Sequence, residues 1–570
     1  MASAFRASIP GFAGWFAGLG ASHPGERRVG ETFWMAAEAG TRPRGVVAVI
    51  AAGGPATLED KAAIAARAAI DEAVARLRGD LKLEGRLLIA LPTFRVGQGG
   101  DREHQLRSAR AQIVAAGEAL RRHPGVDVAF IAYTPSLHRI LLEARRQVMP
   151  GTEVAPPIPP KLEQALVDGE CVLFVGAGLS RGAGLPDWDG LLELMATELG
   201  LQQEAVEGAA TPPKPDPLDL AQWYRDTFKA EGLAALIGKT FGDPKLAPRP
   251  TLAHYLAMSL RCGYVITTNY DALLERTLRA LKRYPLTVID QEDVAGTGRA
   301  DGVHVVKLHG DAARPEGVVL CHDDYDQFFE KRPAMALLLE GLLLNRTFLF
   351  LGYGLRDPNF RQVFNRVGQI LVGAKRPAFA TSFEPATGFG PLLAEQWKRK
   401  GLELVVVPGA AGGERERNLL LWLDRLADRV ASAGPPMLLA PDVEVPGPLA
   451  GLRVKLLEAG EELLALCRAE GPKVLGPAEV GPVAGLLSLL AGQGWRPAGK
   501  AGASLSGTWE RLADLAGDPA TSRRLLIEAL QAAEGEHQAE RVRAKLADLR
   551  TTPGTTGARS IASEGSPIED

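Results

Sequence analysis

Phe174-Val175-Gly176-Ala177-Gly178-Leu179-Ser180-Arg181-Gly182-Ala183-Gly184-Leu185-Pro186-Asp187 joins an apolar run to a helical pattern. The apolar run that ends at Val175 is typical of a buried strand. Small residues between a strand end and a helix start let the backbone approach a phosphate, and unsatisfied N–H groups at the positive end of the helix favour an anion. The stretch therefore predicts an α/β fold with a phosphate-containing ligand at the turn. A tight turn whose glycines serve only packing is the alternative.

The glycine spacing differs from the two common phosphate-binding signatures. A dinucleotide-binding G-x-G-x-x-G would place glycine where Arg181 stands, and a P-loop would require a Gly-Lys-Ser/Thr sequence that the turn lacks. The turn alone therefore does not identify the ligand.

Further apolar runs alternate with helical patterns along the chain. The predicted strands are Cys171–Val175, Tyr264–Thr267, His304–Leu308, Thr347–Leu351, Ala378–Thr381 and Leu402–Val407. Because strands that are apolar throughout are buried on both faces, they predict a parallel sheet covered by helices. Ligands of such sheets bind beyond the carboxyl ends of the strands.

Three polar motifs follow predicted strands in order. They are Thr267-Thr268-Asn269-Tyr270-Asp271, Lys307-Leu308-His309-Gly310-Asp311 and Leu351-Gly352-Tyr353-Gly354-Leu355-Arg356-Asp357-Pro358-Asn359-Phe360. With the glycine turn, they resemble the Gly-Ala-Gly-x-Ser and Gly-Ile-Pro-Asp, Thr-Gln-Asn-x-Asp, His-Gly and Gly-Tyr-Ser-x-x-Asp-Pro-Asn segments of the Sir2 family. The resemblance covers roughly residues 160–430 and implies a Rossmann-like Sir2 domain with a parallel sheet at residues 161–432.

The resemblance implies that this domain binds NAD+ as its substrate. Carried over by position, the binding residues are Gly176, Ala177, Gly178, Ser180, Pro186, Asp187, Thr268, Gly310, Gly352, Tyr353, Gly354 and Asp357. The implied catalytic residues are Asn269, His309 and Asp271. An imidazole titrates near neutrality and can take a proton from a ribose hydroxyl or a water, whereas Asn269 can orient water and ribose without adding charge. Asp271 can orient the loop or balance a developing cation.

Each catalytic candidate also has a structural alternative. Asn269 could cap the helix that begins near Asp271, and His309 could be a hydrogen-bonded histidine in a turn. We expect the histidines outside the motifs to be structural or exposed; these include His254, His304 and His322.

Departures from the family pattern bear on the substrate. Sirtuin deacylases hold a zinc ion with four cysteines after the His-Gly motif, whereas only Cys321 lies between that motif and the Gly-Tyr motif here. The Phe-Arg of many deacylases is replaced by Trp188 and Asp189. The chain resembles instead the Sir2-like NADases of bacterial antiviral defence, which hydrolyse NAD+, and no metal is expected. Gly354 replaces the usual serine of the Gly-Tyr-Ser element, so one expected hydrogen bond is missing.

Two alternatives to NAD+ hydrolysis remain open at this point. The domain could be a regulatory module that binds NAD+ or ADP-ribose without turnover. An NAD-dependent deacylase or ADP-ribosyltransferase is less supported, because the zinc module is missing.

The segment before the Sir2-like region predicts a second α/β domain at residues 1–153, followed by a proline-rich linker at residues 154–160. A strand at Leu87–Leu91, a glycine loop at Gly97–Gly100 and a strand at Val126–Ala132 resemble a macro domain. That resemblance implies binding of ADP-ribose, and a non-binding adaptor is the alternative.

Residues 449–550 are rich in Leu, Ala, Glu and Arg and predict a small helical domain. Its helical patterns include one continuous helix at Ser522–Leu549, and leucines such as Leu486 and Leu490 are candidates for the bundle core. The small polar residues of 551–570 predict a disordered tail.

Composition limits the class of protein. The net charge is -3, from 65 basic and 68 acidic residues, so the sequence gives no clear signal for nucleic-acid binding. The four cysteines show no C-x-x-C spacing, and we expect neither a signal peptide nor a membrane span. These features predict a cytoplasmic protein. Because an unregulated NADase would drain its own cell, we expect one flanking segment to restrain or trigger the enzyme. We also expect a homo-oligomer and a phage-derived or co-encoded trigger protein.

Overall fold

The computed structural model describes residues 29–36, 45–49, 56–94, 102–132, 135–149, 156–201, 216–242, 248–281, 283–298, 302–354, 364, 376–383, 390–410, 413–433, 438–439, 445, 447–468, 475–493, 495, 505–533 and 536–551. The chain divides into two compact units, Met1–Val445 and Pro446–Asp570. The predicted linker at residues 154–160 falls within the first unit, and the domain limits on either side of it stay a prediction.

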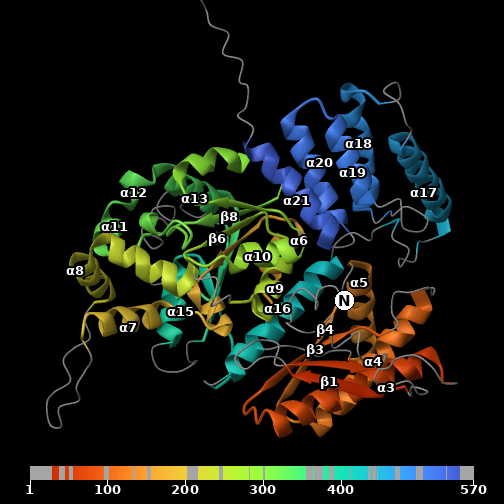
Figure 1. Ribbon diagram of the computed structural model, residues 1–570, viewed down its shortest axis with the longest axis horizontal. Helices are drawn as coiled ribbons and strands as arrows, with labels where there is room; N and C mark the ends of the chain where they lie inside the picture. Colours follow the sequence, from red (N-terminus) through yellow and green to blue (C-terminus); the bar gives the residue numbers. More distant parts are fainter. Residues whose placement is uncertain are drawn as a thin grey trace, which may run out of the picture. The chain divides into compact units, whose positions relative to one another are not determined.

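A seven-stranded sheet dominates the first unit, with the strand order β11-β10-β9-β5-β6-β8-β7 (Figure 1). Its strands are β5 (Cys171–Val175), β6 (Tyr264–Thr267), β7 (Pro285–Val288), β8 (Val303–Lys307), β9 (Thr347–Leu351), β10 (Ala378–Ser382) and β11 (Leu402–Val406). Every neighbouring pair is parallel. The predicted Rossmann-like parallel sheet is confirmed.

The sequence did not indicate strand β7. This strand pairs only with β8 at the edge of the sheet, and its first residue is Pro285. Proline cannot donate a hydrogen bond to a sheet and is found at strand starts and on edge strands. A four-residue strand that begins with proline therefore gives too weak a pattern to predict.

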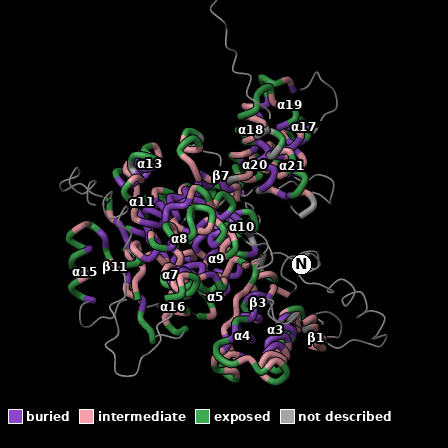
Figure 2. Tube along the Cα trace, turned by 60° about the vertical axis from the view of Figure 1, so that its left-hand side comes forward, coloured by how far each residue is buried: buried purple, intermediate pink, exposed green. Residues whose placement is uncertain are grey.

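Helices cover both faces of the sheet, as the continuous apolar strands predicted. Successive strand residues point to opposite faces, so Leu173 and Val175 join one core while Val172 and Phe174 join the other. The first face is covered by α6 (Pro160–Val167), α9 (Leu252–Ser259), α10 (Leu273–Ala280) and α16 (Glu414–Ala433). The second is covered by α13 (Pro333–Asn345) and α15 (Gly390–Arg399), and buried residues gather around the sheet in Figure 2.

The strand register aligns the ends of the four strands that carry the motifs. Val175 of β5 is paired with Leu351 of β9 on one side and with Thr267 of β6 on the other. Thr267 is paired in turn with Lys307 of β8. These four residues form one row across the sheet, and each motif continues directly beyond it.

A third apolar cluster packs beside the carboxyl ends of β6 and β8. It joins α7 (Trp188–Glu198) and α8 (Pro217–Ile237) to the segments that follow these strands, and the neighbouring short helices are α11 (His322–Asp326) and α12 (Phe328–Lys331). Short 3-10 or π turns are η1 (Arg76–Asp80), η2 (Ala177–Leu179), η3 (Arg181–Ala183), η4 (Gly238–Gly242), η5 (Gln291–Gly298) and η6 (Pro315–Gly317).

The amino-terminal part of the first unit mixes strands and helices. Its elements are β1 (Thr32–Ala36), β2 (Gly45–Val49), α3 (Leu58–Ala75), β3 (Leu87–Pro92), α4 (Arg102–Arg122), β4 (Val126–Ile131) and α5 (Pro135–Val148). Strands β1 and β2 pair antiparallel, and β3 and β4 pair parallel. The glycine loop at Gly97–Gly100 lies outside the described residues. The resemblance to a macro domain is not confirmed.

The second unit is helical. Its helices are α17 (Gly447–Arg468), α18 (Pro477–Gly492), α19 (Leu505–Leu515), α20 (Pro519–Ala532) and α21 (Glu536–Thr551). The prediction of one helix at Ser522–Leu549 is wrong, because Ala533 is extended and the chain folds back so that Arg541 pairs with Glu510. Leu490 is buried as predicted, but Leu486 is 52% exposed and Leu487 takes its place in the core. Residues 552–570 lie outside the described residues.

The prediction placed Leu486 in the core instead of Leu487 because α18 contains adjacent leucines, and several helical phases fit such a run equally well. Among the described residues, no helix combines the length and the apolar character needed to cross a bilayer.

Ion pairs join the amino-terminal part of the first unit to helix α16. Asp428 of α16 is 2% exposed, and it pairs with Arg145 at 3.0 Å and with Arg146 at 3.1 Å, both from α5. Arg425 of α16 pairs with the same carboxylate at 2.8 Å. A buried carboxylate with this many cationic partners is well satisfied, whereas the arginines remain partly open to solvent.

We predict that Asp428→Ala lowers the free energy of unfolding by about 1–3 kcal/mol, because it removes the shared acceptor of three guanidinium groups. Asp424→Ala is the matched control: this residue also pairs with Arg145 but is 40% exposed, so its loss costs less than about 1 kcal/mol. Chemical denaturation of the full chain measures both. Equal losses for the two variants would contradict the assignment.

Candidate functional site

The loops that follow β5 and β9 are joined by backbone hydrogen bonds. Gly176 N–H donates to the carbonyl of Leu351 at 2.9 Å, and Gly178 N–H donates to the carbonyl of Gly352 at 3.0 Å. The N–H groups of Leu179 and Ser180 donate within the turn. The expectation that this turn offers unsatisfied N–H groups to a phosphate is therefore wrong for these four residues.

The glycines of these loops are required by the close approach of the two backbones. A Cβ atom on Gly176 would lie 2.5 Å from the carbonyl oxygen of Gly352. Gly352 has a φ of +61°, and a Cβ there would lie 2.4 Å from the nitrogen of Leu179. Packing thus accounts for these glycines, which is the alternative that the sequence left open. Gly178 is exposed, but a Cβ there would lie 2.8 Å from the carbonyl oxygen of Gly352, so the same close approach requires this glycine. Ala177 is half-buried.

Asp187 caps helix α7. Its Oδ1 accepts a hydrogen bond from the N–H of Gly190 at 3.1 Å, and its Oδ2 lies 3.3 Å from Nε of Arg181. Pro186, which precedes it, is half-buried. The cap explains why this position needs a short acidic side chain.

Asn269 lies two residues beyond the row and is 5% exposed. Its Nδ2 donates to the carbonyl of Gly176 at 3.3 Å and to Oγ of Ser180 at 3.2 Å. A carbonyl only accepts, so these contacts fix which end of the amide faces the turn. Oδ1 of Asn269 is buried and has no hydrogen-bond partner among the described residues. Its backbone N–H binds Oγ1 of Thr267 at 3.0 Å, so the side chain is held on a short turn.

Asp271 and Ser180 form a buried pair beside Asn269. Oγ of Ser180 donates to Oδ2 of Asp271 at 2.9 Å, and Oδ1 of Asp271 accepts the N–H of Leu273 at 2.9 Å. Asp271, not Asn269, therefore binds the first turn of α10. The carboxylate is 4% exposed, and Ser180 is 2% exposed.

Lys307 was not identified from the sequence as a functional residue. Its side chain is fully buried, and Nζ donates to the carbonyls of Asp271 at 2.7 Å and Tyr270 at 3.2 Å. It also pairs with Asp311 and lies 3.7 Å from Glu275. Burial raises the pKa of Glu275, and the charge of Lys307 offsets part of that rise. A lysine that ends an otherwise apolar strand was the available signal, since a buried lysine requires partners.

His309 follows the end of β8 by two residues, as Asn269 follows the end of β6, and the last residues of these strands, Lys307 and Thr267, are register partners. It is 6% exposed, and its ring meets the ring of Tyr325 edge-on with centroids 5.4 Å apart. Gly310 follows with a φ of +87°, where a Cβ would lie 2.8 Å from the carbonyl oxygen of Gly317. The carbonyl of His309 accepts the N–H of Val319 at 3.0 Å, so the turn is fixed on both sides.

A family of SIR2-like domains matches residues 263–405, which include β6 to β10 and the motifs of Asn269, His309 and Gly352. The chain contains a SIR2-like domain. The glycine turn at residues 174–187 precedes the matched residues but is joined to them in the same sheet.

Relatives with known names match the same region. An NAD(+) hydrolase ThsA of Cytobacillus dafuensis is 32% identical over 211 residues, or 37% of this chain and 40% of that protein. An NAD(+) hydrolase ThsA of Enterococcus faecium is 30% identical over 222 residues, or 38% of this chain and 44% of that protein. Defense-associated sirtuin 2 of Bacillus subtilis is 28% identical over 246 residues, or 42% of this chain and 23% of that protein. The alignments thus span less than half the length of these relatives.

Further predicted residues of the SIR2-like domain differ in surroundings. Tyr353 packs its ring against Phe174, with centroids 4.6 Å apart, and Thr268 is half-buried. Gly354 is exposed with open space where a side chain would stand. Asp357 lies outside the described residues.

The three histidines named outside the motifs differ in exposure. His254 and His304 are buried, and the His304 ring stacks on Tyr264 with centroids 4.7 Å apart. The His322 side chain is 44% exposed.

The four cysteines lie in separate places. Cys171 and Cys262 belong to the core on one face of the sheet, Cys321 lies in the cluster beside α8, and Cys467 lies in the second unit. Burial, with the neighbouring carboxylate of Asp324, raises the pKa of Cys321 to about 12, so this thiol stays protonated. The four thiols do not form one tetrahedral site.

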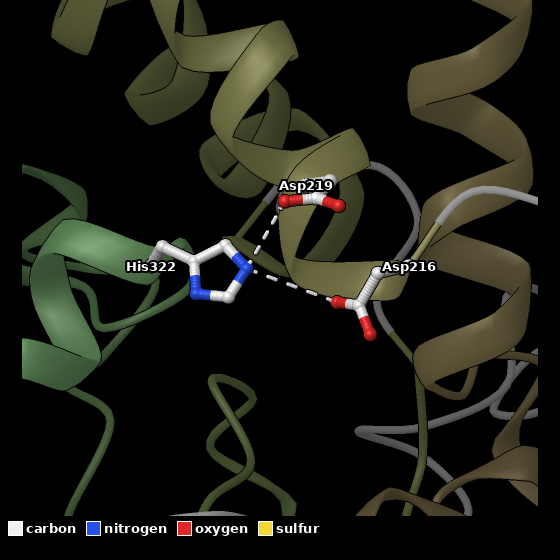
Figure 3. Close-up of side chains that lie close together, drawn as sticks. All are labelled: Asp216, Asp219 and His322. Atoms are coloured by element: carbon white, nitrogen blue, oxygen red, sulfur yellow. Dashed lines mark ion pairs between the residues drawn. The ribbon is translucent and has the colours of Figure 1, made fainter.

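One group of possible metal ligands occurs among the described residues: Asp216, Asp219 and His322 (Figure 3). Nε2 of His322 lies 3.2 Å from Oδ1 of Asp219 and 3.9 Å from Oδ1 of Asp216. All three side chains are 44% exposed or more, and Asp216 already caps helix α8 through the N–H of Leu218. Contacts between exposed side chains at the starts of α8 and α11 account for this group.

We predict that Gly352→Ala lowers the free energy of unfolding of the SIR2-like domain by more than about 2 kcal/mol, because a left-handed residue acquires a side chain against the neighbouring backbone. Gly354→Ser is the matched control and changes it by less than about 0.5 kcal/mol, since the site is open. Thermal melting compares the two, and an unchanged Tm for Gly352→Ala would show that the loops do not need this contact.

We predict that Lys307→Met lowers the free energy of unfolding by about 3–5 kcal/mol, because it leaves Asp311 and Glu275 buried without their cation. Lys398→Met, at an exposed position of α15, is the control and costs less than about 0.5 kcal/mol. Denaturant titration measures both, and a Lys307→Met protein as stable as the control would refute the role of the buried ammonium.

Proposed function

We propose that the SIR2-like domain hydrolyses NAD+ to nicotinamide and ADP-ribose. The observation that carries the proposal is that Asn269 and His309 each follow, by two residues, the paired ends of neighbouring strands, and that a buried Asn269 oxygen lacks a partner among the described residues. The names of the relatives, two of them NAD(+) hydrolases, support the same reaction class.

The reaction consumes one water and releases one proton. The bond between the anomeric carbon of the ribose and the nicotinamide nitrogen breaks, and its electron pair leaves with nicotinamide. The sugar becomes an oxocarbenium ion, water adds to the anomeric carbon, and a base accepts the proton. A site for this chemistry must stabilise positive charge and hold the water.

Charge in the site suits a cationic transition state. Asp271, Asp311 and Glu275 are all buried near the ends of β6 and β8. Lys307 pairs with Asp311 and lies 3.7 Å from Glu275, but it binds Asp271 only through the backbone carbonyl. Buried carboxylates act at short range with little solvent screening, so they favour a developing positive charge on the ribose.

We assign the orienting role to Asn269. Its Nδ2 is held by Gly176 and Ser180, so Oδ1 is left to accept a hydrogen bond from the attacking water or from a ribose hydroxyl. Because the amide cannot rotate without facing one carbonyl with another, its acceptor is preorganised.

We assign the role of base to His309, which receives the proton of the attacking water or of a ribose hydroxyl. The fixed turn around Gly310 and the contact with Tyr325 hold the imidazole in place. Asp271 acts indirectly: it accepts the hydroxyl hydrogen of Ser180, whose oxygen accepts a hydrogen bond from Asn269. The predicted ligand contacts of the glycine turn and of Tyr353, Gly354 and Asp357 remain part of this proposal.

We further propose that the enzyme works in the cytoplasm, where NAD+ is plentiful, without a resident metal. Residues 310–351 hold a single cysteine, which leaves no zinc module for an acyl-lysine substrate. One relative is named as a defence-associated sirtuin, so we place the activity in antiphage defence. A homo-oligomeric state and a trigger protein encoded by the phage or beside this chain complete the proposal.

The decisive test is NAD+ consumption with detection of nicotinamide and ADP-ribose, for the purified chain alone and with lysate of phage-infected cells. We expect His309→Ala and Asn269→Ala to lower turnover by about 100-fold or more, since each removes a group that acts on the reacting atoms. His322→Ala, outside the site, should retain turnover, and EDTA should leave it unchanged.

Binding of NAD+ without consumption under every condition would instead favour a regulatory module. Consumption that depends on an added acyl-lysine peptide would favour a deacylase.

A further inference from the structure

His254, at the start of helix α9, joins the buried network of the site from outside the sequence motifs. The residue is 0% exposed. Its Nδ1 accepts the backbone N–H of Thr251 at 3.2 Å and lies 2.9 Å from Oγ1 of the same residue. A backbone N–H only donates, so Nδ1 carries the lone pair and the neutral ring carries its proton on Nε2.

Nε2 of His254 lies 3.4 Å from Oγ of Ser180. A hydroxyl has one hydrogen to donate and two lone pairs. The hydrogen of Ser180 goes to Asp271 at 2.9 Å, and Nδ2 of Asn269 donates to Oγ at 3.2 Å. His254 therefore supplies the remaining donor, and the hydroxyl is fully engaged. Ser180, which the sequence assigned to the ligand, is turned toward the protein.

We propose that His254 is a positioning residue for NAD+ cleavage: by donating to Ser180, it directs the serine hydrogen to Asp271 and holds the amide of Asn269 in its reactive orientation. This inference rests on the proposed function. His254 touches no reacting atom, and its effect passes through the hydroxyl of Ser180.

The surroundings favour the neutral ring that this arrangement needs. Burial lowers the pKa of His254, and the carboxylate of Asp271 opposes that shift. A second proton would occupy the lone pair of Nδ1 and break the contact with the Thr251 N–H. The neutral ring is therefore the form that satisfies both neighbours.

The two ring nitrogens have separable tasks, which gives a matched pair of variants. Nδ1 caps α9, and Nε2 serves Ser180. Asn at position 254 can place an acceptor near Nδ1 but does not reach Ser180. Gln can place a donor near Nε2 but loses the cap. If His254 only caps α9, His254→Asn should resemble the wild-type protein in turnover more than His254→Gln does. If His254 positions Ser180, His254→Gln should resemble it more.

We expect His254→Asn to keep its Tm within a few degrees and its KM for NAD+ within about twofold, but to lose about tenfold in kcat, as for one lost hydrogen bond. His254→Gln should keep kcat within about threefold while its Tm falls by several degrees. In a Ser180→Ala background, His254→Asn should lower kcat no further. The reverse order of the two variants in kcat, or additive losses, would overturn the proposal.

A second measurement separates this inference from the activity itself. Ring 15N NMR of the full chain, with 15N-labelled histidine, should assign His254 as neutral with its proton on Nε2, and Ser180→Ala should shift that signal. A charged ring or a proton on Nδ1 would refute the proposal even if NAD+ is consumed. A wild-type protein that never consumes NAD+ would instead refute the proposed function, and the NMR result would still decide the tautomer.

Discussion

The buried ammonium of Lys307 holds together the two loops that carry the candidate catalytic residues. An ammonium group without solvent needs acceptors on every side, and here they come from the segment after β6 and from Asp311 after β8. The loop of Asn269 and the loop of His309 therefore cannot separate without exposing a charge to an apolar interior. The positions of these polar groups therefore depend on the stability of the fold at the carboxyl ends of β6 and β8.

The glycine loops impose a second constraint, which is steric. Gly176 and Gly352 allow two backbones to approach more closely than any side chain would permit. The carbonyl of Gly176, held there, is the acceptor that fixes the amide of Asn269. Packing and function are consequently not rival explanations for these glycines, because the packed turn supplies one of the contacts that orient the site.

The sequence predicted the elements whose physical causes are local. Four-to-six-residue apolar strands such as β5 and β9 appeared with their observed limits, and the motifs at their ends were identified with the resemblance to the Sir2 family. Strand β7 was missed because Pro285 weakens its pattern. The break between α20 and α21 was missed because a reversal of chain direction leaves no periodic pattern in the sequence.

The partners of the motif residues could not be predicted, because they depend on register and on helices distant in sequence. The position of Lys307 at a strand end signals only that it needs partners, and His254 lies in no motif. The pairing of Thr267 with Lys307 and the packing of α9 show what these residues bind. The predicted placement of Ser180 at the ligand followed from its position in a motif. Its hydrogen bonds to Asp271 and Asn269 could be found only in three dimensions.

The strand order explains why the matched family region cannot by itself contain the whole site. Strand β5 precedes residue 263 in the chain yet lies between β9 and β6 in the sheet. Its carboxyl end supplies the glycine turn, the carbonyl that holds Asn269 and the hydroxyl that binds Asp271. In a parallel sheet whose first strand is central, the edge that binds ligand is assembled from both halves of the domain. The candidate catalytic residues after β6 and β8 thus depend on a segment that lies about 90 residues before the first of them.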